Sequence, residues 1–138
     1  MAVKHRKITV PTSHSGLYEV TTQCQQWVDA VGIEDGLLVV FCRHTSASLV
    51  LMENADPSAR HDLEDWLDRL VDPHNPHFTH IHEGLDDMPS HIKMALTRSS
   101  ETIPVAGGRL ELGTWQGVSL WEHRAIPHTR ELILSVSS

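Results

Sequence analysis

Alternating polar and apolar residues predict that most of this chain forms β-strands. Residues 4–10 alternate polar and β-branched side chains and stop at Pro11, as expected of an edge strand. Residues 12–16 are expected to form a loop. The run at residues 37–42 is short and apolar, which favours a buried strand. Further strands are predicted at residues 48–52, 102–105, 109–112, 113–122 and 131–136.

Three segments instead carry helical signals. Cys24, Trp27, Val28 and Val31 recur at helical spacing from residue 21, and Gly32 stands where a helix would end. A second helix is expected to begin at Asp56-Pro57, because Asp caps free amides and Pro fits the first turn. Its apolar stripe comprises Leu63, Trp66, Leu67 and Leu70. A third helix is expected over residues 89–98, with Asp86 or Asp87 at its start.

These elements predict an α+β fold. About seven strands and three short helices leave too few helices for regular βαβ alternation. We therefore expect a mainly antiparallel, sandwich-like sheet structure with helical excursions. No repeat or linker divides the chain, so residues 1–138 are expected to form a single domain.

Composition and charge exclude several classes of function. The net charge is −7, with only 11 Lys and Arg residues, so no nucleic-acid partner is expected. No apolar run approaches the roughly 20 residues of a membrane span, and no secretory signal is recognisable. Cys24 and Cys42 fall on predicted core positions, which indicates reduced thiols. A cytoplasmic protein is therefore expected.

The chain holds 11 histidines. For function, the most informative segment is residues 83–91, which contains His91. Asp86, Asp87 and His91 surround a predicted helix start, where free amides and the helix dipole attract anions. The dipole keeps His91 neutral, so that it can serve as a base or a metal ligand. For Asp87, a capping role and a catalytic role both remain open.

Other histidines suggest a metal site. His80 and His82 alternate by two, a spacing common among metal ligands, and His44 ends a predicted strand. We predict that His44, His82 and His91 hold a divalent metal, zinc or magnesium, with carboxylate or water completing the site.

A further set of residues suggests a ligand-binding surface. Trp115 and Gln116 lie between Gly113 and Gly117, which indicates close approach of another backbone or of a bound molecule. Arg109 and Arg124 are isolated positive charges in an acidic chain, and we expect them to hold a phosphate.

Four blocks of sequence together resemble the signature of the YjbQ family. They are HTSASL at 44–49, ENADP at 53–57, GLDDMPSHIK at 84–93 and GRLELGTWQG at 108–117. The resemblance covers residues 8–136, although some relatives carry a histidine where this chain has Pro89. It implies a β-sandwich-like α+β fold, a homotrimer and a secondary thiamine-phosphate synthase activity. The shared polar positions are His44, Glu53, Asn54, Asp56, His91, Arg109, Trp115, Gln116 and Glu122.

Our first hypothesis is therefore an enzyme that acts on a phosphorylated small molecule, with metal and cations neutralising a pyrophosphate leaving group. The catalytic residues would be His44, Glu53, Asp87 and His91. The substrate-binding residues would be Asn54, Arg109, Trp115, Gln116 and Arg124. The alternatives are a non-catalytic metal- or ligand-binding oligomeric module and a hydrolase that uses a metal-bound water.

Overall fold

The computed structural model describes residues 2–138 and shows an α+β fold with two antiparallel sheets. The larger sheet has the order β1-β8-β3-β5-β6 and the smaller sheet the order β2-β7-β4. Its strands are β1 (Val3–Thr12), β2 (Gly16–Glu19), β3 (Gly36–Cys42), β4 (Ala47–Glu53), β5 (Ser100–Ala106), β6 (Arg109–Leu110), β7 (Gln116–Glu122) and β8 (His128–Ser137). The predicted fold class is confirmed.

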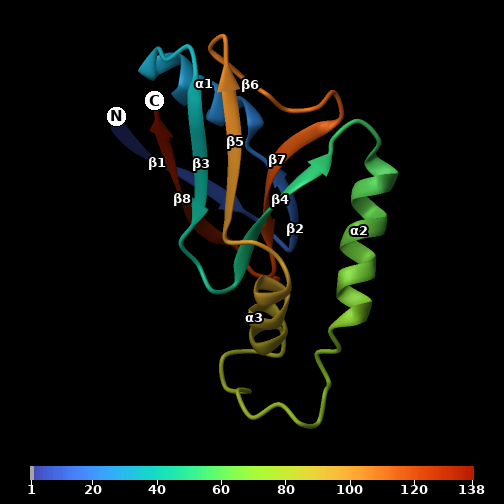
Figure 1. Cartoon of the computed structure of the whole chain (residues 1–138). Helices are drawn as coiled ribbons and strands as arrows, with labels where there is room; N and C mark the ends of the chain where they lie inside the picture. Colours follow the sequence, from blue (N-terminus) through green and yellow to red (C-terminus); the bar gives the residue numbers. More distant parts are fainter. Residues whose placement is uncertain (1) are drawn as a thin grey trace.

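The three helices of the described chain take different positions relative to the sheets (Figure 1). They are α1 (Thr21–Val31), α2 (Pro57–Leu70) and α3 (Asp87–Leu96). Helix α1 ends at Gly32, whose left-handed φ of 77° lets its amide bond to the carbonyl of Val28. Helix α2 begins where Asp56 accepts from the Ser58 amide, as its sequence predicts. None of these helices is long and apolar enough to cross a membrane.

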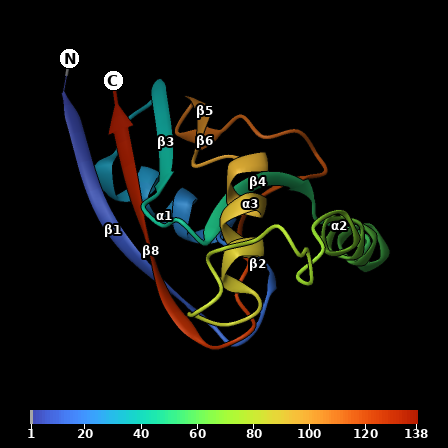
Figure 2. The ribbon, with the colours of Figure 1, turned by 90° about the horizontal axis from the view of Figure 1, so that it is seen from below.

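One apolar core joins α1 to both sheets. Cys24 and Val28 of α1 pack with Leu38 of β3, Leu49 of β4 and Leu120 of β7, and all five are fully buried. Both cysteines are free and buried, which agrees with their prediction as core thiols. Figure 2 shows that the helices lie on one side of the β1-β8-β3 surface, and no helix of the described residues covers its other face.

Several predicted boundaries were wrong. The short strand β2 falls at the end of the predicted loop and continues beyond it, because its Leu17 packs with Trp121 and Leu67 in a second, small apolar cluster. Strand β7 begins only at Gln116, since Gly113 forms a turn. Helix α3 begins at Asp87 rather than at residue 89.

The predicted apolar stripe of α2 is only partly buried. Leu67 is buried, but Trp66 and Leu70 are 60% and 53% exposed. The reason is that α2 packs mainly against β2 and β4, and its Asp68 pairs with Lys93 of α3. The two exposed side chains therefore lie outside that contact.

Candidate metal centre

Three side chains around the start of α3 bring potential metal ligands together. One ligand atom each from His80, Asp87 and His91 lies within 4.8 Å of the others. Asp87 and His91 are four residues apart on α3, so the helix places them on one face. His80 comes from the connection between α2 and α3. Two imidazoles and one carboxylate form a donor set suited to zinc and similar divalent ions.

The Asp87 carboxylate lies at the centre of this group and is only 2% exposed. Its Oδ2 lies 2.7 Å from His80 Nε2 and 3.1 Å from His91 Nε2. Its Oδ1 accepts from Arg124 Nη1 at 2.7 Å. Burial raises the pKa of Asp87, but the hydrogen bond with His80 and the charges of His91 and Arg124 outweigh it, so the pKa lies below the usual value. Asp87 is therefore an anion at neutral pH.

A backbone carbonyl fixes the tautomer of His91. His91 Nδ1 lies 2.7 Å from the carbonyl oxygen of Thr45, and because a carbonyl can only accept, Nδ1 carries the proton. In the neutral ring, Nε2 then has a lone pair directed at the Asp87 carboxylate. Two acceptors 3.1 Å apart need a cation between them, either a second proton on the ring or a metal ion.

Arg124 and Asp86 tie this cluster to the connection between β7 and β8. Arg124 Nη2 donates to the carbonyl of Glu83 at 3.0 Å, and Asp86 Oδ2 accepts from the Ala125 amide at 2.6 Å. Asp86 occupies the N-cap position of α3, but its side chain does not cap the helix. Arg124, predicted to hold a substrate phosphate, is instead engaged with the carboxylates of Asp86 and Asp87.

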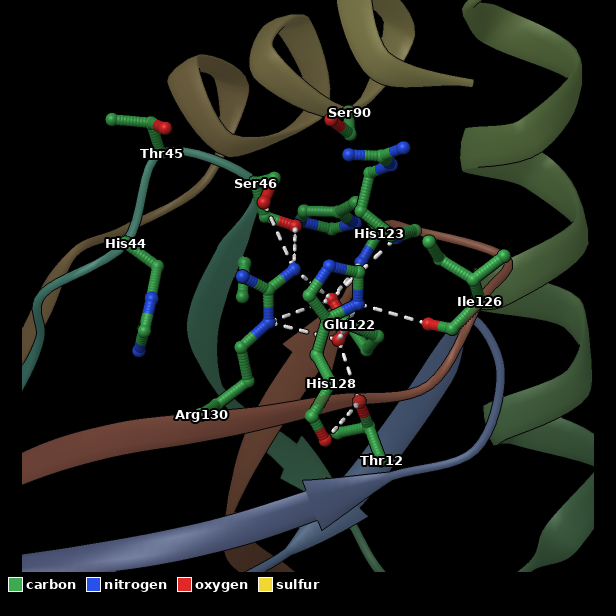
Figure 3. A network of polar contacts seen from close by, with 12 residues as sticks. Thr12, His44, Thr45, Ser46, Ser90, Glu122, His123, Ile126, His128 and Arg130 are labelled. Carbon is green, nitrogen blue, oxygen red and sulfur yellow. Dashed lines mark hydrogen bonds and ion pairs between the residues drawn. The ribbon is translucent and has the colours of Figure 1, made fainter. Parts of the chain in front are cut away.

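A buried polar network includes Glu122 and His123, the two residues before Arg124 (Figure 3). Glu122 is fully buried and accepts from Arg130 Nε at 2.8 Å and from Thr12 Oγ1 at 2.6 Å. His123 Nε2 lies 2.8 Å from Ser48 Oγ. Burial, helped by nearby positive charges, lowers the pKa of His123 to about 3, so the ring is neutral. This network supports the residues that precede Arg124.

The predicted metal triad does not assemble. His44 Nε2 accepts from the Glu131 amide at 2.7 Å, and in Figure 3 its ring points away from Thr45 and Ser46. Burial is the main cause that lowers the pKa of His44, so that this acceptor stays neutral. His82 is exposed. Of the three predicted ligands, only His91 belongs to the cluster, because the loop before α3 directs His80, and not His82, toward Asp87.

Glu53, which was predicted to be catalytic, and the predicted substrate-binding residues Asn54, Trp115 and Gln116 fall at other places. Glu53 pairs with Gln116 at one end of the β4-β7 ladder, whereas Ala47 pairs with Glu122 at the other. At about 3.4 Å per residue these ends are roughly 20 Å apart. Asn54 and Trp115 share the Glu53 end, where the Asn54 amide donates to the carbonyl of Trp115. These residues therefore lie at the opposite end of the ladder from Glu122. The cluster of His80, Asp87 and His91, here called the metal-ligand cluster, is joined to the Glu122 end through Arg124.

The cluster also contains groups that the sequence did not single out. The spacing of His80 and His82 pointed to a histidine in this loop, but gave no means of choosing between them. The carbonyl of Thr45 carries no sequence signal, since every residue has one. Only the tertiary contact between the residue 45 loop and α3 reveals it.

Comparisons of the sequence and of the fold with known proteins point to the same protein family. The family described as UPF0047 protein YjbQ-like matches residues 6–138. A UPF0047 protein of Synechocystis is 50% identical over 135 residues, which cover 97% of this chain and 92% of the relative. The UPF0047 protein YjbQ of Escherichia coli O157:H7 is 42% identical over 132 residues, covering 95% of each chain.

A solved structure agrees with the sequence comparison. An uncharacterized conserved protein of the YjbQ/UPF0047 family from Clostridium acetobutylicum has a TM-score of 0.89 and 32% identity, and the match covers 96% of this chain and 99% of that one. These relatives carry family names and no stated activity. The chain belongs to the UPF0047 YjbQ-like family.

Proposed function

We propose that this protein is an enzyme that acts on a phosphorylated small molecule with the help of a divalent metal held by His80, Asp87 and His91. The observation that carries the proposal is the convergence of three ligand atoms within 4.8 Å, one of them the Nε2 of His91 with its tautomer fixed by Thr45. Such a carbonyl contact on the second ring nitrogen is typical of metal-bound histidine.

Local charge supports the need for a metal. The carboxylates of Asp86 and Asp87 share a single guanidinium, that of Arg124, and the Glu83 carboxylate lies 3.4 Å from His80 Nε2. Without a bound metal ion, the carboxylates outnumber the single guanidinium, and this surface repels a phosphorylated substrate. A divalent ion would balance the carboxylates and stabilise a departing phosphate group.

Within this class, the reaction we propose is thiamine-phosphate synthesis as a secondary activity. A carbon–oxygen bond between the pyrimidine methylene and its diphosphate breaks, a carbon–nitrogen bond to the thiazole phosphate forms, and pyrophosphate leaves. In this chain Arg124 holds the Asp87 carboxylate in place, and Thr45 holds the His91 ring. Leaving-group stabilisation matters more here than a strong base.

Titration calorimetry with Zn²⁺ tests the metal site. His80→Ala and His91→Ala should each weaken binding by roughly tenfold or more, because loss of a ligand costs at least as much as loss of a supporting contact. His82→Ala is the matched control, since this exposed side chain lies two residues from His80. Equal losses in His80→Ala and His82→Ala would contradict the assignment.

Pyrophosphate release tests the reaction. The metal-loaded protein, given hydroxymethylpyrimidine diphosphate and thiazole phosphate, should form thiamine phosphate, and His91→Ala should not. A fully active His91→Ala protein would overturn the catalytic role of this site.

A structural metal is the second candidate, and one observation favours it. His80 lies in the α2–α3 connection, Asp87 and His91 lie on α3, and Arg124 joins them to the β7–β8 connection. A bound ion would cross-link these segments. Tight Zn²⁺ binding that raises the melting temperature, with no turnover on any phosphorylated substrate, would favour this role.

We also propose that the chain forms a homotrimer. The uncovered face of the larger sheet supports an assembly, because Leu37 and Phe41 project from it and are 44% and 45% exposed. Both residues belong to β3, and exposed apolar side chains on an open sheet face are a feature of surfaces that pack against another chain.

A further inference from the structure

A groove between α1 and β6 lies at the other end of the molecule from α3 (Figure 1). Its volume is about 420 Å³, which falls within the range of small-molecule sites. Thr22, Gln26 and Asp29 line it from the helix, and Arg109, Leu110 and Leu112 line it from the β6 segment. Arg109 therefore belongs to a site separate from the metal-ligand cluster.

Gln25 gives this groove a fixed shape. Its Nε2 donates to the carbonyl of Gly108 at 2.9 Å, and its Oε1 accepts from the Leu110 amide at 3.1 Å. The same Nε2 lies 2.9 Å from Asp29 Oδ1. These bonds join helix to strand and orient the Asp29 carboxylate, so the groove is formed before any ligand arrives.

Two opposite charges remain available in the groove. Arg109 is exposed, and within residues 2–138 its guanidinium has no ion-pair or hydrogen-bond partner. Only Oδ1 of Asp29 is used by Gln25, which leaves Oδ2 as an acceptor. Leu110 and Leu112, both half-buried, supply an apolar wall beside these charges.

We propose that this groove binds a small zwitterion of the α-amino-acid type with an apolar side chain. A carboxylate matches the two-pronged guanidinium of Arg109, an ammonium group matches Asp29, and the side chain packs on Leu110 and Leu112. A phosphate dianion fits less well, because Asp29 lines the same groove. The proposal does not depend on the function proposed for the metal centre.

Amide NMR titrations with three related probes test the ligand class. L-leucine carries both charges, 4-methylpentanoate lacks the ammonium group and 3-methylbutylamine lacks the carboxylate. L-leucine should shift the amides of α1 and residues 107–112, and both analogues should bind roughly tenfold or more weakly. No shift with L-leucine, shifts elsewhere only, or equal binding of either analogue would overturn the proposal.

Charge-removing variants test the two named residues. Arg109→Gln and Asp29→Asn should each weaken L-leucine binding by roughly tenfold or more, with the amide spectrum otherwise unchanged. Arg69→Gln and Asp65→Asn are matched controls, because this exposed pair lies on α2 and outside the groove. Unchanged affinity in either groove variant, or an equal loss in the controls, would contradict the assignment.

Discussion

The Asp87 carboxylate receives two imidazoles on one oxygen and a guanidinium on the other, in a nearly dry position. Asp87→Asn replaces an acceptor by an amide donor and leaves Arg124 without its closest charge partner. We expect a loss of roughly 2–4 kcal/mol in the free energy of unfolding, measured with urea at neutral pH.

Asp62→Asn is the control for that loss, since Asp62 is exposed on α2 and should change stability little. An Asp87→Asn protein as stable as the wild type would show that the interactions of this carboxylate make no net contribution to the free energy of unfolding.

The lowered pKa of His123 should make the stability of the protein depend on pH. Its pKa is about 3 in the folded protein against 6.5 in the unfolded chain, so below pH 6.5 only the unfolded chain takes up a proton. Stability therefore falls as pH falls through this window, by about 2 kcal/mol at about pH 5. Urea unfolding across this range should show a shallower pH dependence in His123→Gln. His61→Gln, altered at an exposed ring, should keep the wild-type slope.

At the scale of elements, the loop between β3 and β4 positions His91 without supplying a ligand. His44 accepts from the Glu131 amide of β8, and the next residue offers its carbonyl to His91. His44→Ala should free this loop and weaken Zn²⁺ binding by about tenfold.

His44→Gln distinguishes positioning from ligation, because its carbonyl oxygen can still accept from the Glu131 amide. Zn²⁺ affinity should return toward the wild-type value in this variant. The Glu131 amide should exchange its hydrogen faster in His44→Ala, where it loses its acceptor, but not in His44→Gln. Equal losses in both variants, with unchanged exchange, would indicate the ligand role that the sequence suggested.

The start of β3 depends on a close approach between strands. A Cβ added at Gly36 would lie 2.2 Å from the carbonyl oxygen of Ser137 in β8. Gly36→Ala should therefore force these strand ends apart and cost about 1–3 kcal/mol in thermal or urea unfolding. Thr102→Ala, at an exposed position of neighbouring β5, is the control. An unchanged melting temperature in Gly36→Ala would contradict the close approach.

At the scale of the whole molecule, the open face of the larger sheet predicts assembly. Three chains of 15.5 kDa give a particle of about 46 kDa, which light scattering after gel filtration measures directly. Phe41→Asp should shift the mass toward the monomer, because a charge cannot stay buried unpaired in an interface. Trp66→Asp, at an exposed apolar position on α2, is the control. A wild-type monomer would contradict the proposed trimer.

Local sequence signals predicted much of the fold. The apolar run of β3, the cap of α2 at Asp56 and the stop of α1 at Gly32 each depend on interactions within a few residues, and each is present. Strand β2 was missed because its burial depends on Trp121 and Leu67, which are distant in sequence. Trp66 is apolar enough for a core, but no other segment of residues 2–138 buries it, and it is 60% exposed.

By itself, the sequence determined the fold class and the position of most elements, and it predicted a polar site in the segment from Glu83 to His91. It could do so because hydrophobic period, caps and helix starts are local properties of a chain. The tertiary structure decided which histidines meet. His80 joins Asp87 and His91, while His44 supports the loop behind them, because ligand geometry depends on where distant backbone segments cross.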